Sequence, residues 1–328
     1  MSKIAVVNSS SFGKYFPEHV ARLEKIGTVD FFTFPIDTSG KDLAEKLAGY
    51  EYIIASVTPF FREDFFQHCD PVKLISRHGI GYNNVDIVSA TKHNTYVTKV
   101  GALVEREAVA ENAVALLMSV LRCVREASAA AREGNWAKRA SFMGYEIKDK
   151  TVGVIGLGNI GSRVGEILKN GFNATLIAYD PYQSEDEIRA KGAIPVSLEE
   201  LLQRSDIISL NAFIDQHSKY LLGKEQFAMM KKGVYIVNTA RGELMQLDAL
   251  LEALDNKTVA ALGADVIEGE PIDETHPLLK YPNVIVTPHT SAYTYECLEG
   301  MGEKCVSDVE RVHQGLVPDG LVNTDILK

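Results

Sequence analysis

Four charged or titratable side chains follow three successive apolar runs in the C-terminal part of the chain: Arg241, Asp265, Glu270 and His289. The apolar runs cover residues 234–237, 261–264 and 284–286. Each run has the length of a buried strand, and ligands bind beyond the carboxyl ends of the strands in open α/β sheets. We therefore expect a cation, two carboxylates and an imidazole to lie together at one edge of a sheet.

This combination suits the reduction of a 2-oxo acid. A hydride delivered to the carbonyl carbon leaves an alkoxide that needs a proton, and histidine is the usual donor, which favours His289. The guanidinium of Arg241 can hold a substrate carboxylate through two hydrogen bonds. Glu270 can orient the imidazole and favour its protonated form. Each residue alone would more often be a surface or capping residue, so it is their coincidence that favours this chemistry.

A glycine-rich loop precedes these residues. GLGNIG (156–161) matches G-x-G-x-x-G, follows an apolar run and leads into a helical segment that starts at Ser162. Gly156 permits the tight turn, Gly158 lets the backbone approach a pyrophosphate, and Gly161 lets helix and strand pack closely. In this context the motif predicts a dinucleotide site.

Asp180 bears on the identity of the dinucleotide. It ends the next apolar run, 19 residues beyond Gly161. A carboxylate there accepts hydrogen bonds from the adenosine ribose and repels a 2′-phosphate, and residues 181–183 bring no arginine close. The sequence therefore favours NAD(H) over NADP(H).

The remaining chain alternates short apolar runs with helical segments, which predicts parallel sheets. A first series has runs at residues 4–7, 52–57 and 72–76; a second has six, at residues 151–155, 175–179, 207–210, 234–237, 261–264 and 284–286. Between the two series, residues 105–130 contain no Gly or Pro and predict one long helix. A last helix is expected over residues 296–314.

These series predict an α/β fold with two doubly wound parallel-sheet (Rossmann-like) domains and a cleft between them. The last helix has no sheet of its own, so we expect it to pack back on the N-terminal part. The substrate-binding (catalytic) domain is then discontinuous, with residues 1–101 and 296–328. The NAD-binding Rossmann domain covers residues 102–295.

The composition argues against several other classes of protein. The 328 residues are 46% hydrophobic and 24% charged, which is enough for two globular cores. A net charge of −10 argues against a nucleic-acid binder. The four cysteines lack metal-ligand spacing and fit a reduced protein better than a zinc site or disulfide scaffold. Without a recognisable signal peptide or bilayer-spanning run, we expect no membrane partner and a cytoplasmic location.

The motifs together carry a family resemblance. The chain resembles the D-isomer-specific 2-hydroxyacid dehydrogenases, which include D-lactate, D-glycerate and D-3-phosphoglycerate dehydrogenases. The matching segments span nearly the whole chain: RHGIGYNNVD (77–86), AVAENAVALL (108–117), GLGNIG (156–161), SLNAF (209–213), VNTARGEL (237–244), DVIEGEP (265–271) and TPHTSAYT (287–294). The resemblance implies that the protein reduces a small, pyruvate-like 2-oxo acid to the D-2-hydroxy acid with NADH.

The resemblance also implies roles for individual residues. The implied catalytic residues are Arg241, Glu270 and His289, with His289 as the proton donor. The implied substrate-binding residues are Ile80 and Gly81, through their backbone amides, with Phe60, Tyr293 and Arg241. The implied cofactor-binding residues are Gly156, Gly158, Asn159, Ile160, Gly161, Asp180, Ala212, Phe213, Ser218, Thr239, Ala240, Arg241 and Asp265, the last through the nicotinamide carboxamide. A homodimer is implied too, with the helical stretch after residue 105 at the contact.

Several alternatives stay open at this point. Asn112 and Asn211 depart from a family pattern that often has His at both positions. TPHTSAYT resembles the D-lactate branch, whereas the short interval from Glu270 to His289 resembles the glycerate and phosphoglycerate branches. Glyoxylate or hydroxypyruvate reduction and D-3-phosphoglycerate oxidation are therefore alternatives. The last is disfavoured because only Arg62 is basic in the loop 58–62, whose two phenylalanines indicate an apolar pocket.

A different class of function is also conceivable. A NAD-sensing interaction protein similar to the dehydrogenase-like corepressors could keep the same three residues, although this chain has no long disordered tail for recruiting partners. A formate-oxidising relative would not need a proton-transferring His–Glu pair.

Overall fold

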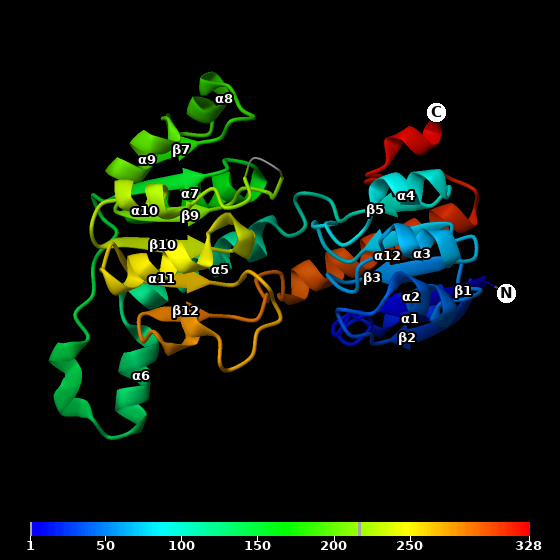
Figure 1. Ribbon diagram of the computed structural model, residues 1–328, viewed down its shortest axis with the longest axis horizontal. Coiled ribbons are helices and arrows are strands. Elements are labelled where there is room, and N and C mark those ends of the chain that lie inside the picture. Colours follow the sequence, from blue (N-terminus) through cyan, green and yellow to red (C-terminus); the bar gives the residue numbers. More distant parts are fainter. Residues whose placement is uncertain (1, 216–217) are drawn as a thin grey trace. The chain divides into compact units, whose positions relative to one another are not determined.

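The chain folds into two compact units (Figure 1). The computed structural model describes residues 2–215 and 218–328. The first unit comprises the chain up to Glu105 together with Tyr293–Lys328, and the second comprises Arg106–Ala292. The boundaries expected from the sequence, at 101/102 and 295/296, lie a few residues away. Within the described part of the chain, no helix combines the length and apolar content needed to cross a bilayer.

The first unit contains a five-stranded parallel sheet with the order β2-β1-β3-β4-β5. Its strands are β1 (Ser2–Val7), β2 (Gly27–Phe32), β3 (Tyr52–Ala55), β4 (Leu74–Arg77) and β5 (Tyr96–Thr98). Its helices are α1 (Pro17–Leu23), α2 (Gly40–Lys46), α3 (Glu63–His68), α4 (Ile87–Lys92), α12 (Tyr295–His313) and the 3-10 helix η4 (Thr324–Leu327). The sequence pattern misses β2, a largely exposed edge strand, and β5, which has three residues.

Helices cover both faces of this sheet because its central strands are apolar on both sides. Along β1, Ala5 and Val7 face the core beneath α2, α3 and α4. The alternate residues Ile4 and Val6 face the core beneath α1 and α12. The C-terminal helix therefore completes the N-terminal unit (Figure 1).

The second unit contains a seven-stranded parallel sheet with the order β12-β11-β10-β9-β6-β7-β8. Its strands are β6 (Thr151–Ile155), β7 (Thr175–Tyr179), β8 (Ile194–Pro195), β9 (Ile207–Leu210), β10 (Val234–Asn238), β11 (Val259–Ala264) and β12 (Val284–Val286). Its helices are α5 (Arg106–Leu121), α6 (Val124–Arg132), η1 (Trp136–Ser141), α7 (Asn159–Phe172), α8 (Glu185–Ala190), α9 (Leu198–Arg204), α10 (Lys224–Met229), η2 (Gly242–Leu244), α11 (Leu247–Asp255) and η3 (Pro277–Lys280). All six predicted strands are present, and the short β8 is added at the edge. The prediction of two parallel-sheet α/β domains is confirmed.

The order of strands places the ligand edge of the second unit. β6 pairs with β7 on one side and with β9 on the other. The chain runs outward from β6 through β7 to β8, then returns to β9 and continues outward on the other side of β6. The carboxyl end of such a strand is a topological switch point, where open α/β sheets bind ligands. The glycine-rich loop follows β6 directly.

The prediction of one long helix over residues 105–130 is wrong in one respect, because the helix is interrupted between α5 and α6. Cys123 adopts a left-handed conformation, with φ 50°. The carbonyl of Leu121 accepts a hydrogen bond from the amide of Tyr145 (3.0 Å), a residue of the segment that packs back on the helix end. A tertiary contact ends this helix without a Gly or Pro, which a local pattern cannot reveal.

His78 is a buried histidine in the first unit. It follows β4, is 7% exposed, and packs edge-on against Phe12 with ring centroids 5.6 Å apart. Burial, with a smaller contribution from Arg77, lowers the pKa of His78 from 6.5 to about 3. The folded protein thus keeps this imidazole neutral at pH values where an unfolded chain would protonate it.

We predict an acid-sensitive contribution to stability from His78. Because the folded pKa lies below the unfolded one, the contribution is complete above about pH 6.5 and is lost as pH falls toward 3, by up to ~1.4 kcal/mol per pH unit. The free energy of unfolding, measured by urea titration between pH 7 and pH 4, should fall less steeply in His78→Gln than in the wild type. The exposed His68→Gln serves as the control, and equal slopes in all three proteins would contradict the assignment.

Candidate functional site

The glycine-rich loop has the geometry that a pyrophosphate requires. Gly156 has φ +86°, and a Cβ on it would lie 2.7 Å from the amide nitrogen of Ala212. A Cβ on Gly161 would lie 2.0 Å from the carbonyl oxygen of Gly156. Around Gly158, the N-cap of α7, a Cβ would meet nothing within 4 Å, and no side chain caps the helix. The first-turn amides of α7, which begins with Asn159 and Ile160, therefore border open space suited to an anion.

A cavity of about 440 Å³ adjoins this loop. Its lining residues are Ile155, Gly156, Gly158, Tyr179, Asp180, Pro181, Tyr182, Gln183, Asn211, Ala212, Phe213, Asp215, Ser218 and Leu221. The sequence-predicted cofactor residues Asp180, Ala212, Phe213 and Ser218 are among them. The lining is mostly apolar with a few polar groups, as in pockets that hold an adenosine.

Asp180 is fixed at the end of β7 by backbone amides. Its Oδ2 accepts from the amide of Leu157 (2.9 Å), and its Oδ1 accepts from the amide of Tyr182 (3.0 Å). The amide side chain of Gln183 also donates to Oδ2 (2.5 Å). The carboxylate is thus held beside the glycine-rich loop, where a ribose hydroxyl would meet it.

The rim of the cavity has two features that the sequence analysis missed. Tyr182 lies against Phe213 with ring centroids 5.2 Å apart, and both side chains are about 60% exposed. The Nζ of Lys191 donates to the carbonyl of Leu157 (2.9 Å) and to the side chain of Gln183. Lys191 and Asp180 thus share Gln183 as a hydrogen-bond partner, so a cation lies near this carboxylate although residues 181–183 contain no arginine.

Two buried polar atoms support the fit of a dinucleotide. Oγ1 of Thr239 and Oδ1 of Asn211 have no hydrogen-bond partner among the residues that the structure describes. Asn211 follows the end of β9, beside the switch point, and Thr239 follows the end of β10, the next strand of the sheet. An unpaired buried acceptor or hydroxyl is costly, and a polar ligand arriving at this edge would satisfy it.

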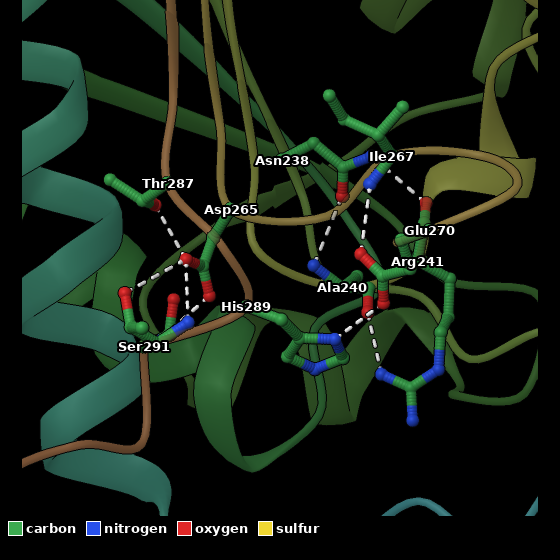
Figure 2. A network of polar contacts seen from close by, with 10 residues as sticks. Asn238, Ala240, Arg241, Asp265, Ile267, Glu270, Thr287, His289 and Ser291 are labelled. Atoms are coloured by element: carbon green, nitrogen blue, oxygen red, sulfur yellow. Dashed lines mark hydrogen bonds and ion pairs between the residues drawn. The ribbon is translucent and has the colours of Figure 1, made fainter. Parts of the chain in front are cut away.

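His289 and Glu270 form the pair that the sequence predicts. The Nδ1 of His289 and Oε1 of Glu270 are 2.5 Å apart (Figure 2), and Oε2 of Glu270 accepts from the amide of Ile267 (3.2 Å). A carboxylate only accepts hydrogen bonds, so Nδ1 carries the proton and Nε2 is left for proton transfer. Both side chains are about one-third exposed, so a ligand can reach them.

Asp265 holds the loop on which His289 stands. The carboxylate is 1% exposed, and it accepts from the Oγ1 of Thr287 (2.5 Å) and the amides of Thr290 (2.8 Å) and Ser291 (2.7 Å). His289 itself has φ +54°, a left-handed conformation that is strained for a residue with a Cβ. The buried carboxylate thus holds the chain on either side of a strained residue, at Thr287 before it and at Thr290 and Ser291 after it (Figure 2). Its contact with a nicotinamide carboxamide stays a prediction.

Arg241 is positioned by the residues around it. The buried Asn238 donates to the carbonyl of Arg241 (2.9 Å) and accepts from the amide of Ala240 (3.0 Å), and Nη1 of Arg241 donates to the carbonyl of Ala240 (2.6 Å). The side chains of Arg241 and His289 point to the same side of the network (Figure 2). The expected cation, carboxylates and imidazole do therefore come together at one edge of the second sheet.

Glu268, the third acid of DVIEGEP, has a different partner. It accepts a hydrogen bond from the hydroxyl of Tyr220, and this bond raises the pKa of Tyr220. The contact is exposed and links the loop after β11 to the segment before α10.

The remaining expected site residues, Phe60, Ile80, Gly81 and Tyr293, lie in the first unit. The amide of Ile80 donates to Oε1 of Glu105 (2.8 Å), and the carbonyl of Gly81 accepts from Nε of Arg77 (2.8 Å). The hydroxyl of Tyr293 lies 3.1 Å from Oγ of Ser10.

The loop 58–62 offers one aromatic ring rather than two. Phe61 is fully buried in the core beneath α2, α3 and α4, whereas Phe60 is half-buried and carries the guanidinium of Arg62 over its ring, 4.8 Å from the centroid. The expectation that both phenylalanines line a substrate pocket is therefore wrong for Phe61.

Comparisons with known proteins identify the family. The model of the NAD binding domain of D-isomer specific 2-hydroxyacid dehydrogenases matches residues 114–291. A glyoxylate reductase of Thermococcus litoralis is 32% identical over 321 residues, which cover 96% of each chain. The chain belongs to the D-isomer-specific 2-hydroxyacid dehydrogenase family, and the predicted oxidoreductase class is confirmed.

Solved structures agree with this assignment. The apo-structure of D-lactate dehydrogenase from Escherichia coli has a TM-score of 0.82 and 31% identity, covering 98% of this chain and 99% of that one. D-lactate dehydrogenase from Aquifex aeolicus, complexed with NAD and lactic acid, has a TM-score of 0.85 and 26% identity with the same coverage.

Gly242 provides a test of how the site is assembled. A Cβ at this position would lie 2.1 Å from the carbonyl carbon of Ile267 and from the amide nitrogen of Glu268, so the loop of Arg241 must pack directly on the loop of Glu270. We predict that Gly242→Ala forces these loops apart, destabilises the protein by about 1–3 kcal/mol and lowers dehydrogenase turnover by roughly 10²-fold.

The matched control is Gly171→Ala on α7, where a Cβ would meet nothing within 4 Å. It should retain full turnover and gain up to ~1 kcal/mol of stability, since alanine favours helix. Steady-state kinetics and urea unfolding of both variants make the comparison. Wild-type turnover in Gly242→Ala would show that this packing does not position the site.

Proposed function

We propose that the protein is an NADH-dependent dehydrogenase that reduces a small 2-oxo acid to the D-2-hydroxy acid. The observation that carries the proposal is the His289–Glu270 pair beside Arg241, at the same sheet edge as the glycine-rich loop. This edge combines a proton donor, a carboxylate-binding cation and a dinucleotide cradle.

Each residue of this chain has a defined part in the proposed reaction. The bound cofactor supplies the hydride. Arg241 binds the substrate carboxylate, helped by the backbone amides of Ile80 and Gly81, and so orients the carbonyl group. Nε2 of His289 gives its proton to the carbonyl oxygen as that oxygen becomes an alkoxide, while Glu270 holds the proton on Nδ1 and stabilises the charged ring.

The chain favours a small substrate without a phosphate. Arg62, the basic residue of loop 58–62, lies over Phe60, so this part of the loop presents an aromatic ring with a cation stacked on it. A pyruvate-like side chain can pack on the Phe60 ring, whereas the phosphate of D-3-phosphoglycerate would find Arg62 as the one basic residue of this loop. Glyoxylate or hydroxypyruvate is the second candidate, supported by the similarity to a glyoxylate reductase over nearly the whole chain.

We propose that the enzyme is a cytoplasmic homodimer. The segment of α6 and η1 extends away from the sheet of its own unit (Figure 1). Trp136 in η1 and Met143 just after η1 are more than 70% exposed, and a patch of exposed apolar side chains would mark a contact surface. The four cysteines are free thiols, which fits a reducing compartment.

Steady-state oxidation of NADH with pyruvate, phenylpyruvate, glyoxylate and hydroxypyruvate tests the function. We predict turnover with at least one of them, and a loss of roughly 10²-fold or more in kcat in His289→Ala, which lacks the proton donor but should still bind NADH. His68→Ala, which changes an exposed histidine at the end of α3, is the control. No turnover by the wild type would refute the enzyme function and favour a NAD-sensing interaction protein.

The preference for NADH over NADPH is predicted to depend on Asp180. In Asp180→Ala the repulsion of a 2′-phosphate is gone and Lys191 can approach it, so the ratio of kcat/KM for NADH over NADPH should fall by about tenfold or more. The double variant with Lys191→Ala should lose the new NADPH activity. Asp186→Ala, an exposed acid of α8, controls for the loss of one negative charge; an unchanged ratio in Asp180→Ala would place the ribose elsewhere.

A further inference from the structure

Glu105 is an acid that none of the chemistry above uses. It is the last residue of the first unit and directly precedes α5. Its Oε1 accepts a hydrogen bond of 2.8 Å from the backbone amide of Ile80. This amide is one of the two that the proposed function assigns to the substrate carboxylate. The carboxylate of Glu105 therefore already occupies an amide that is proposed to bind the substrate carboxylate.

The surroundings of Glu105 form an anion site within the first unit. Gly79, next to Ile80, has φ +153°, and a Cβ on it would lie 3.5 Å both from Oε1 of Glu105 and from Nη2 of Arg77. Arg77 is 1% exposed. Its guanidinium donates through Nε to the carbonyl of Gly81 and through Nη1 to the carbonyl of Ala55. A buried cation and the Glu105 carboxylate thus lie on the same side of Gly79, and the carboxylate accepts from the next backbone amide.

Glycine at position 79 fits this arrangement. Its backbone conformation is one that residues with a Cβ rarely adopt. The turn aims the amide of Ile80 at Glu105, while the bond from Arg77 to Gly81 fixes the other end of the turn. The turn 79–81 therefore directs the amide of Ile80 at a carboxylate, and hydrogen bonds at Ile80 and at Gly81 hold the turn in place.

We propose that Glu105 is an internal competitor for the substrate carboxylate and that it must leave the amide of Ile80 before the substrate binds there. The inference rests on the proposed function, because that function gives the Ile80 amide to the substrate. One N–H group cannot bond fully to two carboxylates, and two negative charges on one donor repel each other. Glu105 is thus a specificity-determining residue that lowers substrate affinity.

The competition has a defined kinetic consequence. Displacing Glu105 weakens the ground state and the transition state equally, because both keep the substrate carboxylate. It therefore raises KM and leaves kcat unchanged. The competition also favours substrates whose carboxylate binds further groups besides the Ile80 amide. At that amide the substrate only replaces the hydrogen bond that Glu105 already makes.

The opposite role would give the opposite result. If Glu105 were a strut that holds the turn 79–81 in its binding shape, its removal would loosen the turn and raise KM. The direction of the change in KM therefore decides between a competitor and a strut. Glu105→Gln keeps an acceptor for the Ile80 amide but removes the charge, and Glu105→Ala removes both.

The experiment compares the wild type, Glu105→Gln, Glu105→Ala and the control Glu107→Gln. Glu107 is a half-exposed acid two residues further on, paired with Arg163 across 2.7 Å. The readouts are kcat and KM for the best 2-oxo acid, the Kd of oxamate in the NADH complex, and the Kd of NADH. Thermal unfolding confirms that each variant is folded.

The expected result is a fall in KM and in the oxamate Kd of about tenfold in Glu105→Gln, with kcat and the NADH Kd within about twofold of the wild type. Glu107→Gln should match the wild type. Unchanged or higher values of KM and of the oxamate Kd in both folded Glu105 variants would overturn the proposal. If the wild type turns over no 2-oxo acid, the proposed function fails, and calorimetric binding of oxamate then decides about Glu105: tighter binding in Glu105→Gln supports competition, and equal or weaker binding overturns it.

Discussion

One buried carboxylate holds the proposed chemistry in place. Asp265 directly follows the strand β11 and accepts hydrogen bonds from Thr287, Thr290 and Ser291, so the residues on either side of His289 are fixed to the sheet. Because a buried charge is tolerated only when it is fully hydrogen-bonded, the loop cannot move away without exposing an unpaired carboxylate. The imidazole therefore belongs to the rigid part of the unit, and only its ring contact with Glu270 depends on a second loop.

The second loop is positioned by close backbone packing rather than by side-chain bonds. Gly242 brings the chain after β10 against residues 267–268, and this contact sets the distance between the guanidinium of Arg241 and the His289–Glu270 pair. Asn238 ties the same segment to its own strand. The ends of β10, β11 and β12 are thus held together by the buried side chains of Asp265 and Asn238 and by the close backbone contact at Gly242.

The sequence predicts the part of this arrangement that strand periodicity and motif spacing encode. The glycine-rich loop, Asp180 and the His289–Glu270 pair could be placed because strand ends of a parallel sheet share one edge. The break at Cys123 could not, since it depends on a bond from Tyr145, and β2 is an exposed edge strand without an apolar run. Glu105 and Ile80 are 25 positions apart in the sequence, so no local sequence pattern predicts their contact. Phe61 shows the same limit, because burial distinguishes it from the adjacent Phe60.

The left-handed backbone of His289 bears on how the protein divides its free energy between folding and activity. Such a conformation costs about 1–3 kcal/mol in a residue with a Cβ and very little in glycine. A glycine at position 289 would relieve this strain, yet it would leave Glu270 without its imidazole. His289 is therefore an example of a trade-off in which the protein is less stable than it could be but keeps a functional side chain.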